Sequence, residues 1–302
     1  HSTGTLGGAE HPFSLAGLTS DGASPVLSSS ASVSLHGWPV PAAQPDSMLH
    51  LDPVKSPSSQ GMGWESILWA QDRWSLRLRG LEKELLRRGP VGPRSSGAVS
   101  EVAVGPSPVP EIGDRRDFSV LNSENKFEKV RARVRFVSDH TLVYVDEETT
   151  SGGYSDSDLE ALAREFDNPV YPTVTEGYGQ ESDLDGNSRI IILFTPAVNR
   201  LTEPGSDGFV GGFFFGGDLL LGSSGSNEGE IFYAIVPDAA GSHGPVISRY
   251  AALATIPAVL AHEFTHMVHF NRRMLVAGAD SPEAVWLSEA LAQMSEDLVA
   301  DA

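Results

Sequence analysis

Residues 260–271, LAHEFTHMVHFN, place three histidines and one glutamate in an otherwise mostly apolar run. The apolar side chains, among them Leu260, Phe264 and Met267, predict a helix that borders a core. Burying two imidazoles and a carboxylate without partners costs several kcal/mol. The fold around this helix must therefore supply either a shared metal ion or carboxylates that pair with the histidines.

His262 and His266 are four residues apart, so both imidazoles project from one face of the helix at neighbouring turns. Two ring nitrogens can then bind one metal ion. Glu263 lies beside them, close enough to reach a water molecule on the metal without being a ligand. This is the H-E-x-x-H pattern, in which zinc lowers the pKa of its water and the glutamate takes the proton.

A catalytic zinc needs a third protein ligand and an open fourth position. Metzincins supply a histidine six residues after the second one, but Arg272 stands at that place. Gluzincins use a glutamate from a second helix, and residues 282–298, PEAVWLSEALAQMSEDL, predict one with Glu289 near its centre. Its apolar positions are expected to pack inward: Val285, Leu287, Leu291, Met294 and Leu298. We expect His262, His266 and Glu289 to be the metal ligands.

Three other polar side chains near these helices have alternative interpretations. Glu296 follows Glu289 by seven residues on the same helical face. It either supports a ligand by hydrogen bonding or is solvated or salt-bridged. Glu283 lies near the start of the helix, where the helix dipole alone explains a carboxylate. His269, three residues after His266, would strain the coordination as a ligand, which leaves substrate contact or packing.

Asp183, Asp185 and Asn187 raise the alternative of a calcium site. An EF-hand loop has its glycine directly after the third ligand position and a bidentate glutamate further on. Here Gly186 precedes Asn187, and no glutamate follows at the required distance. We therefore expect a turn that uses Asp, Gly and Asn for their conformational tolerance, with calcium as the less supported alternative.

The net charge of −19 and the absence of cysteine narrow the classes of partner and of metal site. From residue 139 to the end, the chain has 6 basic and 26 acidic side chains, which would repel nucleic acid and anionic membranes. Without thiolates, a metal must be held by histidine and carboxylates.

No run approaches the roughly 20 apolar residues of a membrane span. The chain begins with His1, so we expect a removed signal segment or a fragment.

The composition divides the chain into three segments. Residues 1–62, with 13 serines and many Gly and Pro, predict a low-complexity flexible leader. Residues 63–112 predict an amphipathic helix from Trp64 to Arg88, stopped by Gly89-Pro90, and then a Pro/Gly linker. The apolar face of this helix comprises Ile67, Trp74, Leu78, Leu81 and Leu85. The helix either docks onto residues 113–302 or serves as a pro-segment or partner-binding helix.

Within residues 113–302, KVRARVRFVS and TLVYVDE predict two paired strands with a turn near Asp139. SDSDLEALAREFDN predicts a short helix with Ser155 or Ser157 as N-cap. The apolar run Ile190 to Phe194 predicts a strand buried on both faces. GFVGGFFFGGDLLL predicts either a strand near a cleft, since glycine permits close backbone approach, or a plain core strand. Pro257 is expected in the first turn of the H-E-x-x-H helix.

Five segments together resemble the hyicolysin family of secreted bacterial zinc metallopeptidases, which belongs to the gluzincins. They are LAHEFTHMVHFN, WLSEALAQMSEDL, SDLDGNSRIIILFTP, GGFFFGGDLL and SNEGEIFYAIVPD. The resemblance covers about residues 113–302, and the first hundred residues do not contribute. It implies an exported, zinc-dependent endopeptidase, secreted or at the bacterial cell surface, with one catalytic zinc on His262, His266 and Glu289 and with Glu263 as catalytic base.

Two features depart from the family pattern. Ser288 and Ala290 stand where the family usually has Asn and Gly on either side of the glutamate, which bears on local substrate contacts. Only 13 residues follow Glu289, whereas gluzincins generally continue into a helical subdomain that closes the cleft. We therefore expect the catalytic domain, residues 113–302, to be truncated at its C-terminal end.

The overall expectation is an α+β, zincin-like domain. A twisted sheet built from about residues 115–220 should pack on the H-E-x-x-H helix and on the helix that carries Glu289. The predicted function is hydrolysis of a protein or peptide that pairs with the strand Gly211 to Gly217. The alternative is a non-catalytic surface or adhesion module with a structural or degenerate zinc site, in which His269 or Glu296 would be a fourth protein ligand.

Overall fold

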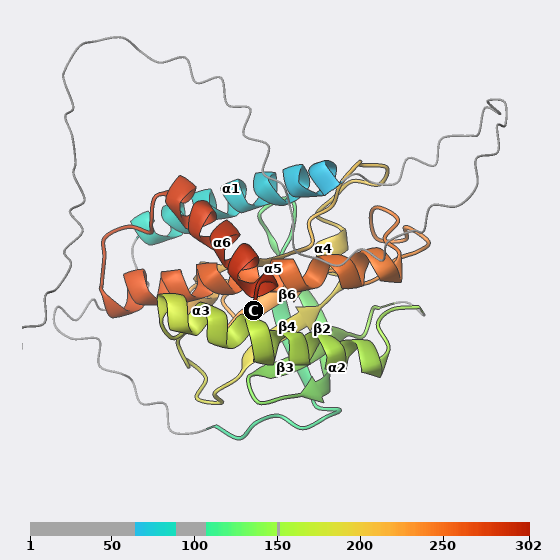
Figure 1. Cartoon of the computed structure of the whole chain (residues 1–302), viewed down its shortest axis with the longest axis horizontal. Helices are drawn as coiled ribbons and strands as arrows, with labels where there is room; N and C mark the ends of the chain where they lie inside the picture. Colours follow the sequence, from blue (N-terminus) through green and yellow to red (C-terminus); the bar gives the residue numbers. More distant parts are fainter. Residues whose placement is uncertain (1–63, 89–106, 150–151) are drawn as a thin grey trace, which may run out of the picture. The chain divides into compact units, whose positions relative to one another are not determined.

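The computed structural model describes residues 64–88, 107–149 and 152–302. The predicted leader, residues 1–62, and most of the predicted linker, residues 89–106, lie outside this part of the chain. The described part has the mixed α and β composition that the sequence predicts, with helices packed against one sheet (Figure 1). None of its helices is long and apolar enough to cross a membrane.

The sheet has six strands in the order β1-β2-β3-β4-β6-β5. Their bounds are β1 Arg115–Leu121, β2 Phe127–Val137, β3 Thr141–Asp146, β4 Ile190–Phe194, β5 Gly212–Phe214 and β6 Ile231–Ala234. The central β4 is parallel to β3 and β6, and the other pairs are antiparallel. The expected limit of the sheet near residue 220 was wrong, because β6 lies beyond it and separates β5 from β4.

The pairing of β2 with β3 and the burial of β4 agree with their sequence patterns. β2 and β3 pair as the expected hairpin on either side of Asp139. All five residues of β4 are buried, because this central strand is covered on both faces, as parallel strands usually are. The three-residue β5 ends the sheet and pairs with β6 on one side only.

The α-helices are α1 Trp64–Arg88, α2 Asp156–Glu165, α3 Tyr171–Tyr178, α4 Pro196–Asn199, α5 Arg249–Phe270 and α6 Val285–Ala300. Short π or 3₁₀ segments, η1 Phe166–Val170, η2 Gly216–Leu219 and η3 Asn271–Val276, extend or connect them. α1 has the predicted bounds. Ser155 is the N-cap of α2, where its side chain and that of Asp158 form a capping box.

The helix with the H-E-x-x-H pattern, α5, begins earlier than expected. Ser248 caps it by accepting a hydrogen bond from the Ala251 amide. Pro257 therefore lies in the helix interior, and its predicted place in the first turn was wrong. A proline inside a helix costs about 3 kcal/mol. The buried side chains of Ala252 and Ile256 show why the helix continues through it: the extra turns cover part of the core.

α5 lies between the sheet and α6. On one side Phe264 contacts Phe232 of β6, with ring centroids 6.3 Å apart. On the other side α6 crosses α5 (Figure 1). The buried positions of α6 are small: Ser288, Ala292, Ser295 and Val299. The expected inward packing of Met294 and Leu298 was wrong, since these side chains are 46% and 45% exposed.

A hydrogen bond explains why small residues line this crossing. Thr265 of α5 donates to the Ser295 hydroxyl of α6 at 2.6 Å, with both residues fully buried. Two hydroxyls can meet only where the helix backbones come close, and bulky side chains would hold them apart. The larger apolar side chains of α6 consequently turn outward.

Glycine residues also allow β5 and the start of η2 to approach α5 closely. A Cβ atom at Gly212 would lie 2.7 Å from the Tyr233 carbonyl oxygen and 3.0 Å from the Val259 side chain. At Gly216 it would lie 2.4 Å from the Phe270 ring. Both positions therefore require glycine, and the resulting contact places the edge strand beside Glu263 of α5.

Candidate metal centre

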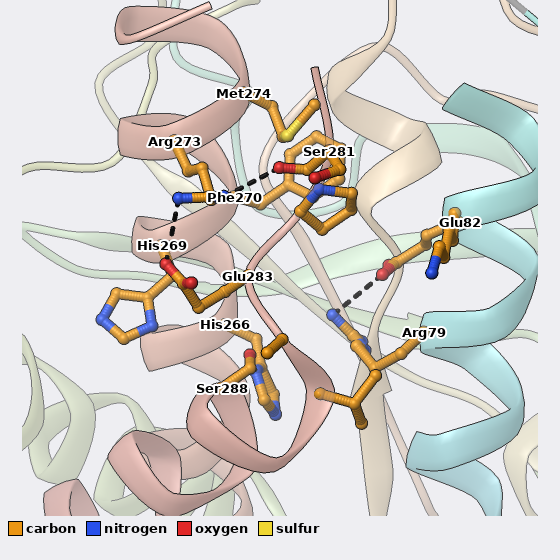
Figure 2. Close-up of a pocket in the computed structure, with 14 residues that line it drawn as sticks. Arg79, Glu82, His266, His269, Phe270, Arg273, Met274, Ser281, Glu283 and Ser288 are labelled. Atoms are coloured by element: carbon orange, nitrogen blue, oxygen red, sulfur yellow. Dashed lines mark hydrogen bonds and ion pairs between the residues drawn. The ribbon is translucent and has the colours of Figure 1, made fainter. Parts of the chain in front are cut away.

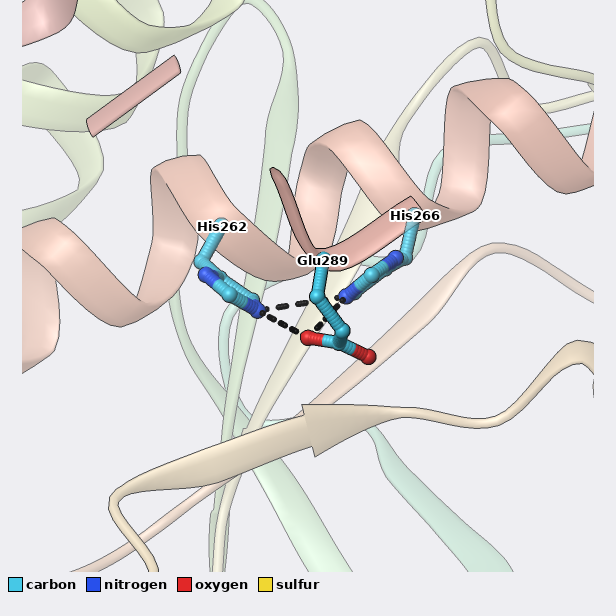
Figure 3. A group of neighbouring side chains, drawn as sticks. All are labelled: His262, His266 and Glu289. Carbon is cyan, nitrogen blue, oxygen red and sulfur yellow. Dashed lines mark hydrogen bonds and ion pairs between the residues drawn. The ribbon is translucent and has the colours of Figure 1, made fainter. Parts of the chain in front are cut away.

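The three predicted metal ligands lie together. His262 and His266 project from α5 and Glu289 from α6, and their donor atoms converge (Figure 3). The two histidine Nε2 atoms are 3.2 Å apart. Glu289 Oε2 is 3.2 Å from Nε2 of His262 and 3.4 Å from that of His266. The donors thus form a nearly equilateral triangle.

The size of this triangle fits a metal ion. Zinc binds histidine nitrogen at about 2.0–2.1 Å in tetrahedral geometry, which separates neighbouring ligand atoms by about 3.3 Å. The other oxygen of Glu289, Oε1, is buried and has no hydrogen-bond partner. An orphaned carboxylate oxygen beside two imidazole nitrogens is stabilised by a cation. The donor set and spacing therefore suit zinc.

Each histidine is oriented through its other ring nitrogen. His262 Nδ1 is 2.7 Å from Glu296 Oε1, and His266 Nδ1 is 2.9 Å from the Ser288 hydroxyl. A proton on each Nδ1 can be donated to these oxygens, which leaves both Nε2 lone pairs free for a metal. Glu296 thus contacts a predicted ligand, a contact that is both the predicted hydrogen bond and the alternative salt bridge. The contact between Ser288 and His266 was not predicted from the position of Ser288 beside Glu289.

The protonation states of the group depend on burial and on the carboxylates. Burial lowers the pKa of His266 to about 3, so its ring is neutral. Burial also lowers the pKa of His262, but hydrogen bonds to Glu289 and Glu296 outweigh it and raise that pKa to about 10. The same two histidines hold the pKa of Glu289 below its usual range, against the effect of burial. A metal ion must therefore displace a proton from His262.

Glu263 is buried, and each of its carboxylate oxygens accepts a hydrogen bond. Oε2 accepts from the backbone amide of Phe214 in β5, and Oε1 accepts from the Gln71 side chain of α1, both at 3.0 Å. Burial raises the pKa of Glu263 to about 7. A carboxylate with a pKa near neutrality is suited to exchanging protons with a reacting group. Glu263 lies outside the triangle of donor atoms, as its position in the motif predicts.

A cavity of about 360 Å³ opens beside His266. Figure 2 shows Arg79 and Glu82 reaching into it from α1, opposite His266, His269 and Phe270 of α5. His269 is not in the metal triangle. Its ring lies edge-on to Tyr178, with centroids 4.9 Å apart, and its Nδ1 has no partner. It therefore occupies the cavity wall, which agrees with substrate contact or packing and not with ligation.

The acidic segment before β4 forms the expected turn. Asp185 Oδ1 accepts from the Asn187 amide and Asp183 Oδ1 from the Ser188 amide, at 3.2 and 3.0 Å. Gly186 has a φ of 70°, which glycine adopts without strain. Asp183 and Asp185 also lie near the buried Glu230, which the sequence did not associate with them. These hydrogen bonds account for the turn, and calcium there stays a prediction.

The sequence assigned no role to Gln71, which contacts the glutamate of the motif. Gln71 occurs three residues before Trp74 and seven before Leu78, so it lies on the otherwise apolar face of the helix. Trp74 and Leu78 are buried. A polar residue on such a face needs a partner in the core. The position of Gln71 in the sequence therefore indicated that it has a buried hydrogen-bond partner. Which partner it finds depends on how α1 docks.

Comparison with known proteins points to a metalloprotease. The chain is similar to the neutral metalloprotease ShpI of Staphylococcus hyicus, with 29% identity over 189 residues. The match covers 62% of this chain and 41% of that protein, so the chain spans less than half the length of this relative. No family model matches the chain. The similarity supports a relationship to metalloproteases in general, and membership of the hyicolysin family stays a prediction.

Proposed function

We propose that this chain carries the catalytic domain of a zinc-dependent endopeptidase of the gluzincin type, with a zincin-like fold. His262, His266 and Glu289 are the metal ligands in this proposal, and Glu263 is the general base. The similarity to a neutral metalloprotease supports it. An exported bacterial enzyme, secreted or at the cell surface, and membership of the hyicolysin family follow from the sequence resemblance. The substrate class is protein or peptide.

The observation that carries the proposal is the triangle of donor atoms with Glu263 beside it. Three protein donors spaced 3.2–3.4 Å apart leave a fourth tetrahedral position for water. In a structural site a fourth protein ligand would take that position. The two residues considered for it are engaged elsewhere: Glu296 bonds Nδ1 of His262, and His269 packs on Tyr178. This arrangement favours catalysis over the non-catalytic alternative.

The reaction combines metal and protein groups. Zinc held by His262, His266 and Glu289 would lower the pKa of a water molecule and polarise the scissile carbonyl. Glu263 would accept a proton from this water as the water oxygen bonds to the carbonyl carbon, and would pass the proton to the amine nitrogen as the C–N bond breaks. The outer edge of β5 holds an extended substrate through backbone hydrogen bonds. The α5 wall of the cavity beside His266, which includes His269, faces a side chain of the substrate.

The test is hydrolysis of dye-labelled denatured casein by the zinc-loaded chain and by its Glu263→Gln variant. Because loss of a general base costs roughly 10²–10⁴-fold in rate, the variant should lose that factor while it retains one equivalent of zinc. Glu176→Gln, a substitution at an exposed position of α3, serves as the control and should match the wild-type rate. Equal rates in wild type and Glu263→Gln would refute the assigned base. Zinc without hydrolysis in any of these proteins, including one from which α1 has been cleaved, would favour the non-catalytic alternative.

A further inference from the structure

Helix α1 covers the outer edge of β5, where a substrate would bind. β5 pairs with β6 through one edge only, so its other edge can pair with another strand. In this structure the Phe214 amide donates to Glu263 of α5, and α1 contacts other backbone groups along this edge. The Gln71 side chain accepts from the Gly211 amide at 2.9 Å and donates to the Gly212 carbonyl at 2.8 Å.

The same pattern continues along the strand. Arg79 donates to the Phe214 carbonyl oxygen at 2.8 Å, and Glu82 accepts from the Gly216 amide at 2.6 Å. Arg79 and Glu82 also pair with each other at 3.1 Å. Three side chains of one helix thus engage backbone groups from residue 211 to residue 216. A side-chain amide has the donor and acceptor of a peptide unit, so Gln71 replaces part of an extended strand.

Occupation by α1 and by a substrate is mutually exclusive. A pairing strand must come within about 4.8 Å of its neighbour and needs the same donors and acceptors. The buried Trp74 ring, 5.5 Å from that of Phe213, adds apolar contact that a substrate would have to displace. Substrate therefore competes with α1 for the edge strand.

Gln71 also engages the base. Its amide nitrogen donates to Glu263 Oε1 at 3.0 Å while it donates to the Gly212 carbonyl. The other oxygen of Glu263 accepts from the Phe214 amide. Each oxygen of the carboxylate thus accepts a hydrogen bond from a protein donor. Because such bonds stabilise the ionised form, the Gln71 contact makes Glu263 a weaker base towards water. A single side chain of α1 links the substrate edge to the proposed catalytic group.

We propose that α1 is an autoinhibitory helix, which holds β5 and Glu263 in a closed state until it is displaced or cleaved away. This inference rests on the proposed function, since it assumes that the edge of β5 binds peptide. It selects the pro-segment role from the alternatives that the sequence left open. Release of α1 exposes the backbone edge and frees Glu263 in one step.

The test compares peptide binding by the full chain with Gln71 intact and with Gln71→Glu. This near-isosteric change places a carboxylate oxygen against the Gly212 carbonyl oxygen, so α1 is repelled from β5 while the residue keeps its volume. Gln71→Ala, which removes the hydrogen bonds without repulsion, is the second variant. Arg73→Ala is the control, because Arg73 is an exposed residue of the same helix. All four proteins are zinc-loaded and carry Glu263→Gln, so that bound peptide is not cleaved.

Binding of a fluorescein-labelled casein peptide is followed by fluorescence anisotropy. We expect Gln71→Ala to bind about tenfold more tightly, as loss of hydrogen bonds worth a net 1–2 kcal/mol implies, and Gln71→Glu to bind more tightly still. Arg73→Ala should match the parent. Equal or weaker binding by both Gln71 variants would overturn the inference and make α1 a permanent part of the fold.

Hydrolysis of casein by the same variants with Glu263 restored separates the two proposals. Tighter binding without hydrolysis in any protein would leave the autoinhibitory contact standing and reject the peptidase. Hydrolysis at equal rates in wild type, Gln71→Ala and Arg73→Ala would support the peptidase and reject autoinhibition. If both Gln71 variants fail to fold, as judged by circular dichroism, α1 is required for stability and the inference is also rejected.

Discussion

Single residues beyond the three ligands should set how tightly the metal is held. Glu296 accepts the hydrogen bond that orients His262, at 2.7 Å. Loss of such a partner typically lowers metal affinity by roughly 10–100-fold. We therefore expect Glu296→Ala to bind zinc that much more weakly in chelator competition. Asp297→Asn changes the exposed neighbour and should bind like wild type. Equal affinities in the two variants would show that Glu296 does not support the ligand.

A buried carboxyl outside the site should control how stability varies with pH. Asp218 is fully buried, and burial raises its pKa to about 7 even though Tyr233 and Asn227 donate hydrogen bonds to it. In the unfolded chain an aspartate titrates near 3.9. Because the folded value is higher, this group adds stability that is complete below about pH 4 and is lost as the pH rises through about 7.

Asp218→Asn removes this titration. Relative to the variant, wild-type protein should lose on the order of a few kcal/mol of unfolding free energy between pH 4.5 and 8. Urea unfolding of both proteins measures this difference in unfolding free energy. Metal-free buffer excludes any effect of pH on zinc binding. Parallel pH profiles would mean that Asp218 titrates normally in the folded protein.

At the scale of elements, the close packing of β5 on α5 depends on glycine. A Cβ at Gly216 would overlap the Phe270 ring, whereas one at Gly80, on the exposed side of α1, would meet nothing within 4 Å. Gly216→Ala should therefore destabilise the protein by about 1–3 kcal/mol. Gly80→Ala should stabilise it by up to about 1 kcal/mol, since alanine favours helix. If both substitutions shifted the unfolding temperature in the same direction, the result would contradict this account.

Local patterns predicted most elements but not how closely they pack. The Ser155 cap, the β2–β3 hairpin and the bounds of α1 depend on neighbouring residues, and all three were predicted. Met294 and Leu298 were misplaced because amphipathic spacing does not reveal that hydroxyl pairing draws α5 and α6 together. Pro257 was misplaced because burial of the preceding turns outweighs the local cost of proline. In each case tertiary contact overrode a local rule.

At the scale of the whole molecule, a metal ion bound at the proposed site would join two helices and should contribute to global stability. His262 and His266 come from α5, and Glu289 comes from α6. A ligand that binds only the folded state stabilises it by about 4 kcal/mol at a thousand times its Kd. Zinc should therefore raise the unfolding temperature, and EDTA should reverse the increase. Glu289→Ala should show a smaller shift, and an equal shift would place the zinc elsewhere.

The sequence predicted which three donor residues lie together better than it predicted their surroundings. His262 and His266 are held together by helix geometry alone, and Glu289 could be placed because its helix follows within a short return of the chain. Gln71 is 192 residues from Glu263, and no local pattern relates such distant positions. The contact that we assign to autoinhibition therefore emerged only from the docking of α1.

Zinc K-edge X-ray absorption on the zinc-loaded chain tests the central claim most directly, because it counts the atoms around the metal. We predict one zinc per chain with two imidazole nitrogens and two oxygens at about 2.0–2.2 Å, one oxygen from Glu289 and one from water. The Glu289→Ala variant should lose one protein oxygen. A site with three imidazoles, or a spectrum that Glu289→Ala leaves unchanged, would contradict the open three-ligand centre on which the proposed peptidase depends.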